Sequence, residues 1–452
     1  MNTPVYDFAR RYADSGTVRA HMPGHKGKPL LGCEPLDLTE IAGADELFAP
    51  TGIIAESEAN ASKIFGCQTL YSTEGSSLCI RAMLYLAMRH AVSQYRRPVI
   101  AAARNAHKTF LTAAALLDLG ILWLPQNDTN SYLENGGEEA WEACLNAPHK
   151  PTALYLTSPD YLGNIADIRA AASFCHAHDM LLLVDNAHGA YLHFLPEPLH
   201  PAGLGADLCC DSAHKTLPVL TGGAYLHIAD SAPEICRKYA KNALSLFAST
   251  SPSYLILESL DLSNAYLSDH FPAELNGAIG SVKRLKNDLS ADGWTLTGQE
   301  PLKLTIRPKS CGYTGAALAD TLQKQHIYVE FADPDFTVLM LSPQNKPEDF
   351  AAIHDALISL PKLAPIRTSP PPFPMPGRVM TPRQAIFSFD TETLPVEQCI
   401  GRICAEFAVS CPPAVPIVIC GERITEEADA CMKYYGIRRC TVTKSGKKPC
   451  DP

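Results

Sequence analysis

The chain lacks any long run of apolar residues. None approaches the roughly 18 residues that cross a membrane, and no basic stretch followed by an apolar one opens the chain as in a secretion signal. Charged residues make up only 19% of the sequence, and the formal net charge of -10 argues against nucleic acid and suits a cationic small molecule. We therefore expect a cytoplasmic protein that binds neither membranes nor nucleic acid.

Paired cysteines and recognisable metal ligands are also missing. The 16 cysteines are scattered, and no two are spaced as Cys-x-x-Cys. Without a secretion signal, this favours buried, reduced thiols over disulfides or zinc. Histidines form close pairs, such as His21 with His25, but no carboxylate or cysteine pattern accompanies them. We expect no metal.

Length and the order of apolar runs predict several domains. At 452 residues the chain exceeds what one hydrophobic core usually supports. Short apolar runs alternate with helical stretches, which predicts an α/β fold with a mostly parallel sheet covered on both faces. A smaller α+β unit and a Pro-rich connector follow. The expected divisions are an N-terminal arm (1–50), a large domain (51–265), a small α+β domain (266–362), a linker (363–384) and a C-terminal domain (385–452).

Individual elements follow from hydrophobic pattern and turn residues. The predicted strands of the large domain are 99–103, 121–124, 152–157, 180–184, 206–210 and 223–228. Its predicted helices, with one in the arm, are 5–12, 56–65, 78–92, 109–119 and 168–178. The predicted elements of the remaining chain are strands 294–297, 303–307, 328–331 and 338–342, helices 314–325 and 396–407, and an apolar run at 415–420.

One lysine stands where an α/β enzyme can place a reactive amine. Lys215 follows the apolar run 206–210 and is flanked by Ser212 and His214. A lysine at the exit of a buried strand is expected to be partly desolvated, which disfavours its ammonium form. The resulting amine can form a Schiff base with a carbonyl cofactor. A solvated lysine is the ordinary alternative.

Polar side chains follow other predicted strands as well. Ligands of open α/β sheets bind outside the carboxyl ends of the strands. Asp185 closes the run 180–184, where a carboxylate can keep a pyridine nitrogen protonated, as pyridoxal phosphate (PLP) requires. A helix or turn cap is the alternative. His107 follows the run 99–103 and could stack on a planar cofactor or serve only the structure.

A phosphate site is predicted before the helix 78–92. Gly75, Ser76 and Ser77 would place backbone N–H groups and hydroxyls at its N-terminus, where a phosphate is favoured. An ordinary serine cap is the alternative. Taken in chain order, a phosphate cup, a ring-stacking group, a pyridinium partner and a Schiff-base lysine predict PLP as the cofactor.

Ten motifs spread over nearly the whole chain carry a family resemblance. They are His21-Met-Pro-Gly-His-Lys-Gly27, Asp37-Leu-Thr-Glu40, Asp45-Glu-Leu47, Ala103-Arg-Asn-Ala-His-Lys108, Asp185-Asn-Ala-His-Gly-Ala190, Ser212-Ala-His-Lys-Thr-Leu-Pro218, Thr250-Ser-Pro-Ser-Tyr254, Ile400-Gly-Arg402, Cys411-Pro-Pro-Ala-Val-Pro416 and Gly421-Glu-Arg423. With them the sequence resembles the Orn/Lys/Arg decarboxylase family, bacterial PLP-dependent enzymes of the aspartate-aminotransferase fold (fold type I). That fold implies a seven-stranded sheet.

The resemblance implies roles for individual residues. Lys215 would be the Schiff-base lysine and Asp185 the partner of the pyridine nitrogen. His107 would stack on the ring, Ala187 would lie beneath its other face, and His188 would also bind the cofactor. The residues implied to hold the phosphate are Gly75, Ser76, Ser77, Ser212 and His214.

A homodimer is implied too, because family active sites lie at a dimer interface. Thr250 and Ser251 would reach a phosphate in the partner subunit. The chain is short for the family and lacks the N-terminal receiver-like domain of its larger members, so we do not expect their decamer.

Three positions depart from the family's pattern. Glu74 stands where relatives carry Asn, Asp160 where Thr is usual, and Cys411-Pro-Pro-Ala414 replaces Tyr-Pro-Pro-Gly. Asp160 could help to hold a cationic side chain or cap a loop. Glu330 resembles a position that faces the substrate, with a solvated glutamate at a strand end as the alternative.

The expected reaction is α-decarboxylation of arginine, lysine or ornithine to the corresponding amine. Lys215 and His107 are both candidates for the acid that protonates Cα. Because a fold does not fix a reaction, transamination and carbon–carbon lyase chemistry remain alternatives. A degenerate homologue without catalysis is another.

Overall fold

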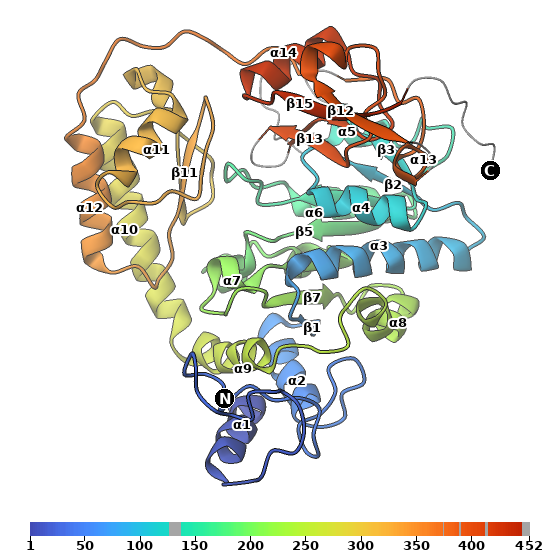
Figure 1. Cartoon of the computed structure of the whole chain (residues 1–452), viewed down its shortest axis with the longest axis vertical. Helices are drawn as coiled ribbons and strands as arrows, with labels where there is room; N and C mark the ends of the chain where they lie inside the picture. The colour runs from blue at the N-terminus through green and yellow to red at the C-terminus, as the bar shows by residue number, and fades with distance from the viewer. Residues whose placement is uncertain (126–136, 374, 388–389, 412–414, 445–452) are drawn as a thin grey trace. The chain divides into compact units, whose positions relative to one another are not determined.

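The computed structural model of the protein describes residues 1–125, 137–373, 375–387, 390–411 and 415–444 (Figure 1). The family motif at 411–416 therefore lies partly outside the described residues. The chain forms two compact units, which are described one by one. The first unit comprises residues 1–98, 152–158 and 167–276, and the second comprises 99–151, 159–166 and 277–452.

The first unit holds most of the main sheet and its helices. Its helices are α1 (Pro4–Asp14), α2 (Ile53–Phe65), α3 (Gly75–Ser93), α6 (Ile168–Ala177), α7 (Ala213–Thr216), α8 (Glu234–Ser245), α9 (Tyr254–Asp269), the start of α10 (Phe271–Ala291), and the 3-10 turns η1 (Ala190–Phe194) and η2 (Pro201–Leu204). Its strands are β1 (Gln68–Ser72), β4 (Ala153–Thr157), β5 (Leu181–Asp185), β6 (Leu208–Asp211) and β7 (Ala224–Ile228).

The main sheet has seven strands in the order β1-β7-β6-β5-β4-β2-β3. In the first unit β5 runs parallel to β4 and β6, whereas β7 is antiparallel to both of its neighbours. All residues of β5, β6 and β7 are buried, because helices cover the sheet and the strands are almost continuously apolar. The register pairs Asp185 with Cys210, so the chain segments that follow β5 and β6 start side by side.

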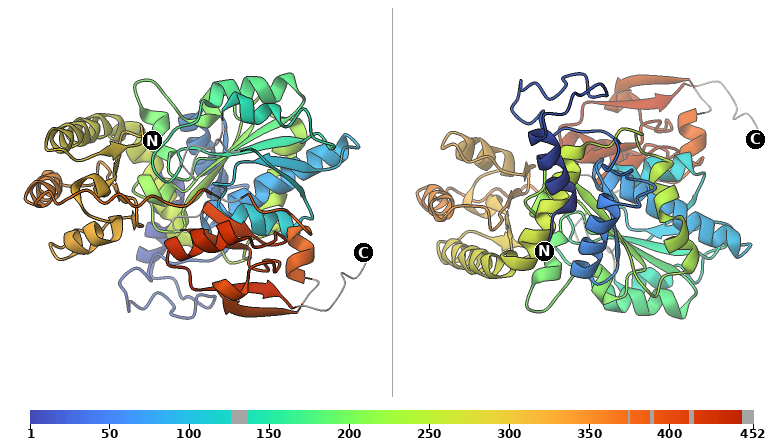
Figure 2. Two further views of the ribbon diagram at one scale, coloured as in Figure 1. Left: turned by 90° about the horizontal axis from the view of Figure 1, so that it is seen from above. Right: turned by 90° about the horizontal axis from the view of Figure 1, so that it is seen from below.

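Helices of the first unit pack around these strands. Helix α3 lies along β5, β6 and β7 (Figure 1). Helices α1, α2 and α9, coloured dark blue, blue and yellow-green, pack side by side, as the right view of Figure 2 shows. Between α1 and α2 the chain is built of turns, as expected for the arm, and Asp45 accepts backbone N–H groups of Thr51, Gly52 and Ile54 there.

The second unit contains the remaining elements. Its helices are α4 (Lys108–Leu116), α5 (Glu138–Glu142), the rest of α10, α11 (Gly315–Gln323), α12 (Pro347–Ile358), α13 (Pro382–Phe387), α14 (Glu426–Tyr434), and the 3-10 turns η3 (Pro308–Cys311) and η4 (Val396–Gln398). Its strands are β2 (Val99–Ala102), β3 (Gly120–Trp123), β8 (Leu296–Thr297), β9 (Lys303–Ile306), β10 (Phe331–Ala332), β11 (Thr337–Met340), β12 (Thr391–Pro395), β13 (Ala408–Cys411), β14 (Val415–Ile419) and β15 (Arg439–Thr443). Strands β10, β11, β9 and β8 form an antiparallel sheet, and β12–β15 and β13–β14 form two further pairs.

The six strands predicted in the large domain are confirmed as strands, and the mostly parallel α/β sheet is confirmed with them. The sequence analysis missed β1, the antiparallel edge strand beside β7. Its sequence is short and begins with polar Gln68 and Thr69, so it offers no apolar run.

Two elements expected in the second unit are wrong in extent. Only Val396–Gln398 is helical where the helix 396–407 was expected, because Gly401 has a φ of 80° and the chain then forms isolated bridges. The strand expected at 328–331 is limited to Phe331–Ala332. Glu330 thus precedes a strand rather than ending one.

Among the helices of the described residues, none combines the length and the apolar character that crossing a bilayer requires. The cysteines with described side chains are all unpaired, and all but Cys33 are buried, as expected for reduced thiols.

Candidate active site

Lys215 lies on the single-turn helix α7, directly beyond the end of β6. Its Nζ donates to Nε2 of buried His188 over 3.0 Å. Lys215 is exposed as a residue, but its contact with His188 is part-buried, so its partial desolvation stays a prediction.

Asp185 ends β5 and is only 3% exposed. Its Oδ2 accepts the hydroxyl of Tyr155 at 3.0 Å, and its Oδ1 accepts the backbone N–H of Ala187 at 3.2 Å. Burial, with the Asp185 carboxylate close by, raises the pKa of Tyr155 well above its usual value, so the phenol remains a donor. Asp185 thus both closes the turn after β5 and keeps an oriented carboxylate at the strand end.

The anion site expected from the sequence falls at the N-terminus of α3. Gly75 has a φ of 70°, which glycine adopts without strain, and it begins a helix of 19 residues. Ser76 and Ser77 follow in the first turn, where the positive end of the helix dipole favours an anion.

Residues after β6 complete this cup. The hydroxyl of Ser212 donates to that of Ser76 at 2.8 Å, and both serines are buried. His214 donates from Nδ1 to the carbonyl of Gly223 at 2.9 Å. A Cβ on Gly75 would lie 4.0 Å from the ring of His214, so the two loops approach closely. Hydroxyls, a ring nitrogen and helix N–H groups therefore gather in one place, and this donor set fits a phosphate.

Glu74, one of the departures from the family pattern, precedes the cup. Its Oε1 accepts the backbone N–H of Ser249 at 2.7 Å. Thr250 and Ser251 follow that residue and are exposed. Glu74 therefore ties the loop with Thr250 and Ser251 to the start of α3.

His107 belongs to the second unit, where it caps α4. Its Nδ1 accepts the backbone N–H of Thr109 at 3.3 Å. The structure thus supports the structural role that the sequence left open, and this role is compatible with stacking by the ring face.

Asp160 is 1% exposed and closes a loop in the second unit. Its Oδ1 accepts the backbone N–H of Asn164 at 2.8 Å, and its Oδ2 accepts the side-chain amide at 2.7 Å. Burial raises the pKa of Asp160 to about 6, against the hydrogen bonds from Asn164 that lower it. These contacts favour the loop cap over a contact with a cationic substrate.

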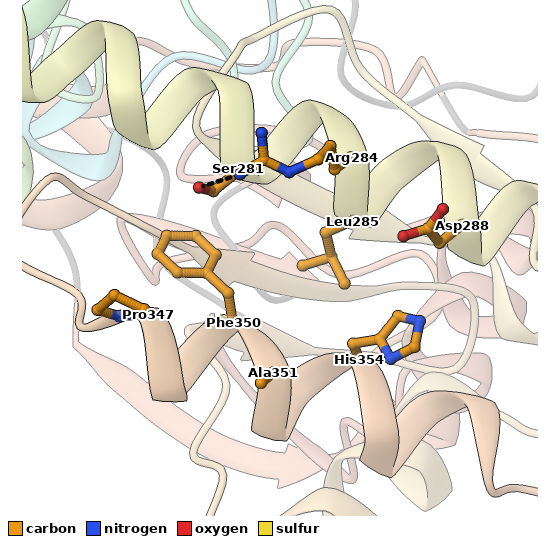
Figure 3. Close-up of a pocket in the computed structure, with 8 residues that line it drawn as sticks. All are labelled: Ser281, Arg284, Leu285, Asp288, Pro347, Phe350, Ala351 and His354. Carbon is orange, nitrogen blue, oxygen red and sulfur yellow. Dashed lines mark hydrogen bonds between the residues drawn. The ribbon is translucent and has the colours of Figure 1, made fainter.

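Glu330 is exposed, and its Oε1 accepts the hydroxyl of Tyr161 at 2.8 Å. It lines a hollow of about 590 Å³ within the second unit, together with Tyr328 and Asp349. A smaller hollow of about 220 Å³ lies between α10 and α12 (Figure 3) and contains none of the expected site residues.

Two of the family motifs meet in a buried ion pair that sequence reasoning missed. Nη1 of Arg104 lies 2.7 Å from Oε1 of Glu422, and Nη2 lies 3.1 Å from Oε2. The two side chains are 1% and 2% exposed. Arg104 and Glu422 each lie in a family motif, which marked both as noteworthy in the sequence. Neither motif indicates that the two residues pair with each other.

Comparison with known proteins agrees with this architecture. The major-domain profile of the Orn/Lys/Arg decarboxylases matches residues 3–298, and their C-terminal-domain profile matches 372–443. The chain is 31% identical over 467 residues to the Uncharacterized protein YaaO of Bacillus subtilis, covering 95% of this chain and 93% of that one. It is 29% identical over 458 residues to an arginine decarboxylase of B. subtilis, covering 94% and 92%. The constitutive lysine decarboxylase of E. coli has the same fold, with a TM-score of 0.77, 19% identity, and coverage of 98% of this chain and 82% of that one.

The seven-stranded sheet, with Asp185 at the end of β5 and Lys215 just beyond β6, defines the fold class as fold type I. Within that class the chain belongs to the Orn/Lys/Arg decarboxylase family and is an amino-acid decarboxylase.

Proposed function

We propose that the enzyme converts a basic L-amino acid, arginine, lysine or ornithine, to its amine and carbon dioxide with PLP as the cofactor. The observation that supports this most is the pair of groups after β5 and β6. Asp185, a buried carboxylate, begins the turn that follows β5, and Lys215, an exposed amine, follows β6. His188 in that turn contacts the amine of Lys215.

Bound PLP supplies an electron-withdrawing ring that accepts the electron pair left when carbon dioxide departs. In our proposal Lys215 holds the cofactor's carbonyl carbon, and Asp185 holds a proton on the ring nitrogen. Tyr155 supports that role, because its hydrogen bond orients the Asp185 carboxylate. Ala187 follows Asp185 in the turn and would lie against the ring.

The phosphate would be held by the cup at the start of α3. Ser76 and Ser77 would donate from the helix N-terminus and Ser212 and His214 from the loop after β6, while Gly75 would let the phosphate approach the backbone closely. The Ser212–Ser76 hydrogen bond supports the assignment because it brings two hydroxyls together at the helix end.

Protonation of Cα needs an acid near the amine. Lys215 would hold that proton on Nζ, which lies 3.0 Å from Nε2 of His188, so the ring nitrogen could take up or return the proton. We therefore favour Lys215 over His107, whose Nδ1 is engaged in capping α4.

Substrate choice is the finer part of the proposal. Relatives that cover more than nine-tenths of the chain are named arginine decarboxylases, and the protein is acidic overall. Glu330 is the carboxylate that we assign to the cationic end of the substrate, since it is exposed and oriented by Tyr161. Asp160 is the weaker candidate because Asn164 occupies both of its oxygens.

We further propose a homodimer in which Thr250 and Ser251 reach the partner's cofactor. Their exposure and the anchoring of their loop by Glu74 support this. Light scattering coupled to size-exclusion chromatography tests the assembly, and a monomer that is fully active would contradict it. The cytoplasmic location and the domain boundaries expected from the sequence stay predictions.

The reaction is tested by incubating PLP-loaded enzyme with each common amino acid and measuring amine, carbon dioxide and keto acid separately. We expect equal amounts of amine and carbon dioxide from at least one basic amino acid. Keto acid without carbon dioxide would show transamination instead. Bound PLP without any product would indicate a degenerate homologue.

A further inference from the structure

A buried polar cluster lies at the end of β6, one residue before Ser212. Asp211 is 0% exposed, and His200 and His227 beside it are each 1% exposed. Nε2 of His200 and Nε2 of His227 lie 2.9 and 3.0 Å from Oδ2 of Asp211. The other oxygen, Oδ1, accepts the side-chain amide of Asn186 at 2.6 Å.

The backbone assigns the proton of His200. The N–H of Ala202 donates to its Nδ1 at 3.3 Å, so the ring proton is on Nε2 and faces Asp211. Nε2 of His227 faces the same carboxylate oxygen at 3.0 Å, and because an ionised carboxylate can only accept, this nitrogen also carries a proton. Both rings then act as donors to the carboxylate.

Two histidines and an aspartate also resemble a metal site by residue type, and their ligand atoms are close enough. A metal would need the lone pair of Nε2 of His200, which moves its proton to Nδ1. That proton would face the N–H of Ala202, a donor against a donor. The geometry therefore favours a hydrogen-bonded network.

The charge of the cluster follows from these contacts. Burial alone would raise the pKa of Asp211, but His200 and His227 outweigh it and hold that pKa well below its usual range. Burial lowers the pKa of His227, and it also lowers that of neighbouring His193 to about 4. Asp211 is therefore an ionised carboxylate that accepts from both histidines and from Asn186.

Asn186 joins this cluster to the candidate active site, because its side chain binds Asp211 and its backbone lies between Asp185 and Ala187. The side-chain amide of Asn186 donates a hydrogen bond to Asp211. Its backbone N–H donates to the carbonyl of Cys210 at 2.9 Å, and its own carbonyl accepts the N–H of Gly189 at 2.8 Å. Asn186 is thus held at three points. The residues on either side of it, Asp185 and Ala187, belong to the turn that presents the carboxylate.

We propose that Asp211 is a positioning residue: held by His200 and His227, it fixes Asn186 and so sets the turn between Asp185 and His188 against the cofactor. The inference rests on the proposed use of PLP at Lys215. Asp211 itself touches no reacting group. It acts through the orientation of Asn186.

The test compares Asp211→Asn with a matched control, Asp207→Asn. Asp207 precedes β6, is 3% exposed, and also accepts a histidine Nε2, that of His176 at 3.1 Å, and a backbone N–H, that of Leu182 at 2.8 Å. It therefore resembles Asp211 in burial and partners but lies at the opposite end of the strand.

Three quantities are measured for each variant: the melting temperature without cofactor, the dissociation constant of PLP, and the pH dependence of the visible absorption of bound PLP. In Asp211→Asn one of the two accepting oxygens becomes an NH₂ group, so either the histidines lose their acceptor or the side-chain amide of Asn186 must turn over to keep a hydrogen bond. We expect PLP to bind about ten- to hundredfold more weakly and its absorption titration to shift. In Asp207→Asn we expect a lower melting temperature with neither change.

Asn186→Ala keeps the test decisive if Asp211→Asn folds poorly. It removes only the side-chain amide that donates to Asp211, and it should weaken PLP binding to a similar extent. In the double variant the two effects should not add, because both act through one hydrogen bond. Additive effects, equal effects of Asp207→Asn, unchanged PLP binding in both site variants, or a stoichiometric divalent metal in the purified protein would each overturn the inference. Failure of the proposed reaction is distinguishable, because it would appear as PLP binding without carbon dioxide release.

Discussion

Replacing Glu422 with alanine removes one half of the buried ion pair with Arg104. Two unit charges about 4 Å apart attract by about 4 kcal/mol at an effective dielectric constant of about 20. Loss of one partner of a buried pair generally costs about 3–5 kcal/mol, since the remaining charge stays buried. The carbonyls of Pro416 and Ile417, 3.1 and 3.3 Å from Nη2, can soften this cost but cannot neutralise the charge. We expect the melting temperature to fall by about 5 °C.

Thermal melts followed by circular dichroism provide the assay, with a matched exposed pair as the control. Nη2 of Arg402 lies 2.6 Å from Oε1 of Glu392, but these side chains are 22% and 36% exposed. Glu392→Ala should therefore cost less than about 1 kcal/mol. The double variant Arg104→Met with Glu422→Met should regain most of the lost stability, because no charge is left buried. A Glu422→Ala protein that melts with the parent, or a double variant no better than the single one, would refute this reasoning.

Three further outcomes are expected. Burial raises the pKa of Glu258 from 4.5 to about 8, so the stability that its protonated form provides is complete below pH 4.5 and is lost as pH rises through 8. Glu258→Gln should then raise the melting temperature more at pH 9 than at pH 5, and an equal shift at both would contradict the assignment. Asp185→Asn should lower kcat about tenfold or more, measured as amine formation at saturating PLP, since a neutral amide cannot hold the ring proton. Glu74→Ala should weaken PLP binding severalfold by releasing the loop of Thr250 and Ser251, whereas Glu74→Gln should retain binding because it keeps an acceptor.

The main sheet could be predicted from the sequence because its strands are buried on both faces. Such strands appear as continuous apolar runs, and β5, with the sequence Leu-Leu-Leu-Val-Asp, is the clearest case. A strand that is buried on one face only, or that is very short, has no continuous apolar run by which it could be predicted. Strand β10 has two residues, and the apolar residues before it were wrongly included.

The helix expected at 396–407 failed for a different reason. Helical spacing of apolar residues was present, but the 3-10 turn that follows Pro395 ends at Gln398, and the positive φ of Gly401 turns the chain away from a helix. Cys399 and Cys404 are nevertheless buried in the core of the C-terminal region. Their spacing reflects burial of an irregular segment, which periodicity alone cannot separate from a helix.

For the site, the sequence indicated which residue types gather but not which of them touch. The order of apolar run and polar residue placed Asp185 and Lys215 beyond neighbouring strands. The contact of Asp185 with Tyr155 joins residues 30 positions apart, and that of Arg104 with Glu422 joins residues 318 positions apart. Such pairs are set by tertiary packing, so one sequence cannot reveal them.

The central claim, decarboxylation of a basic amino acid at Lys215, is tested most directly by carbon dioxide release from carboxyl-labelled arginine, lysine and ornithine. Purified parent enzyme and Lys215→Ala are assayed side by side with saturating PLP, and circular dichroism confirms that both are folded. The account predicts release from at least one of the three by the parent and none above background by the variant. Near-normal release by Lys215→Ala would contradict it.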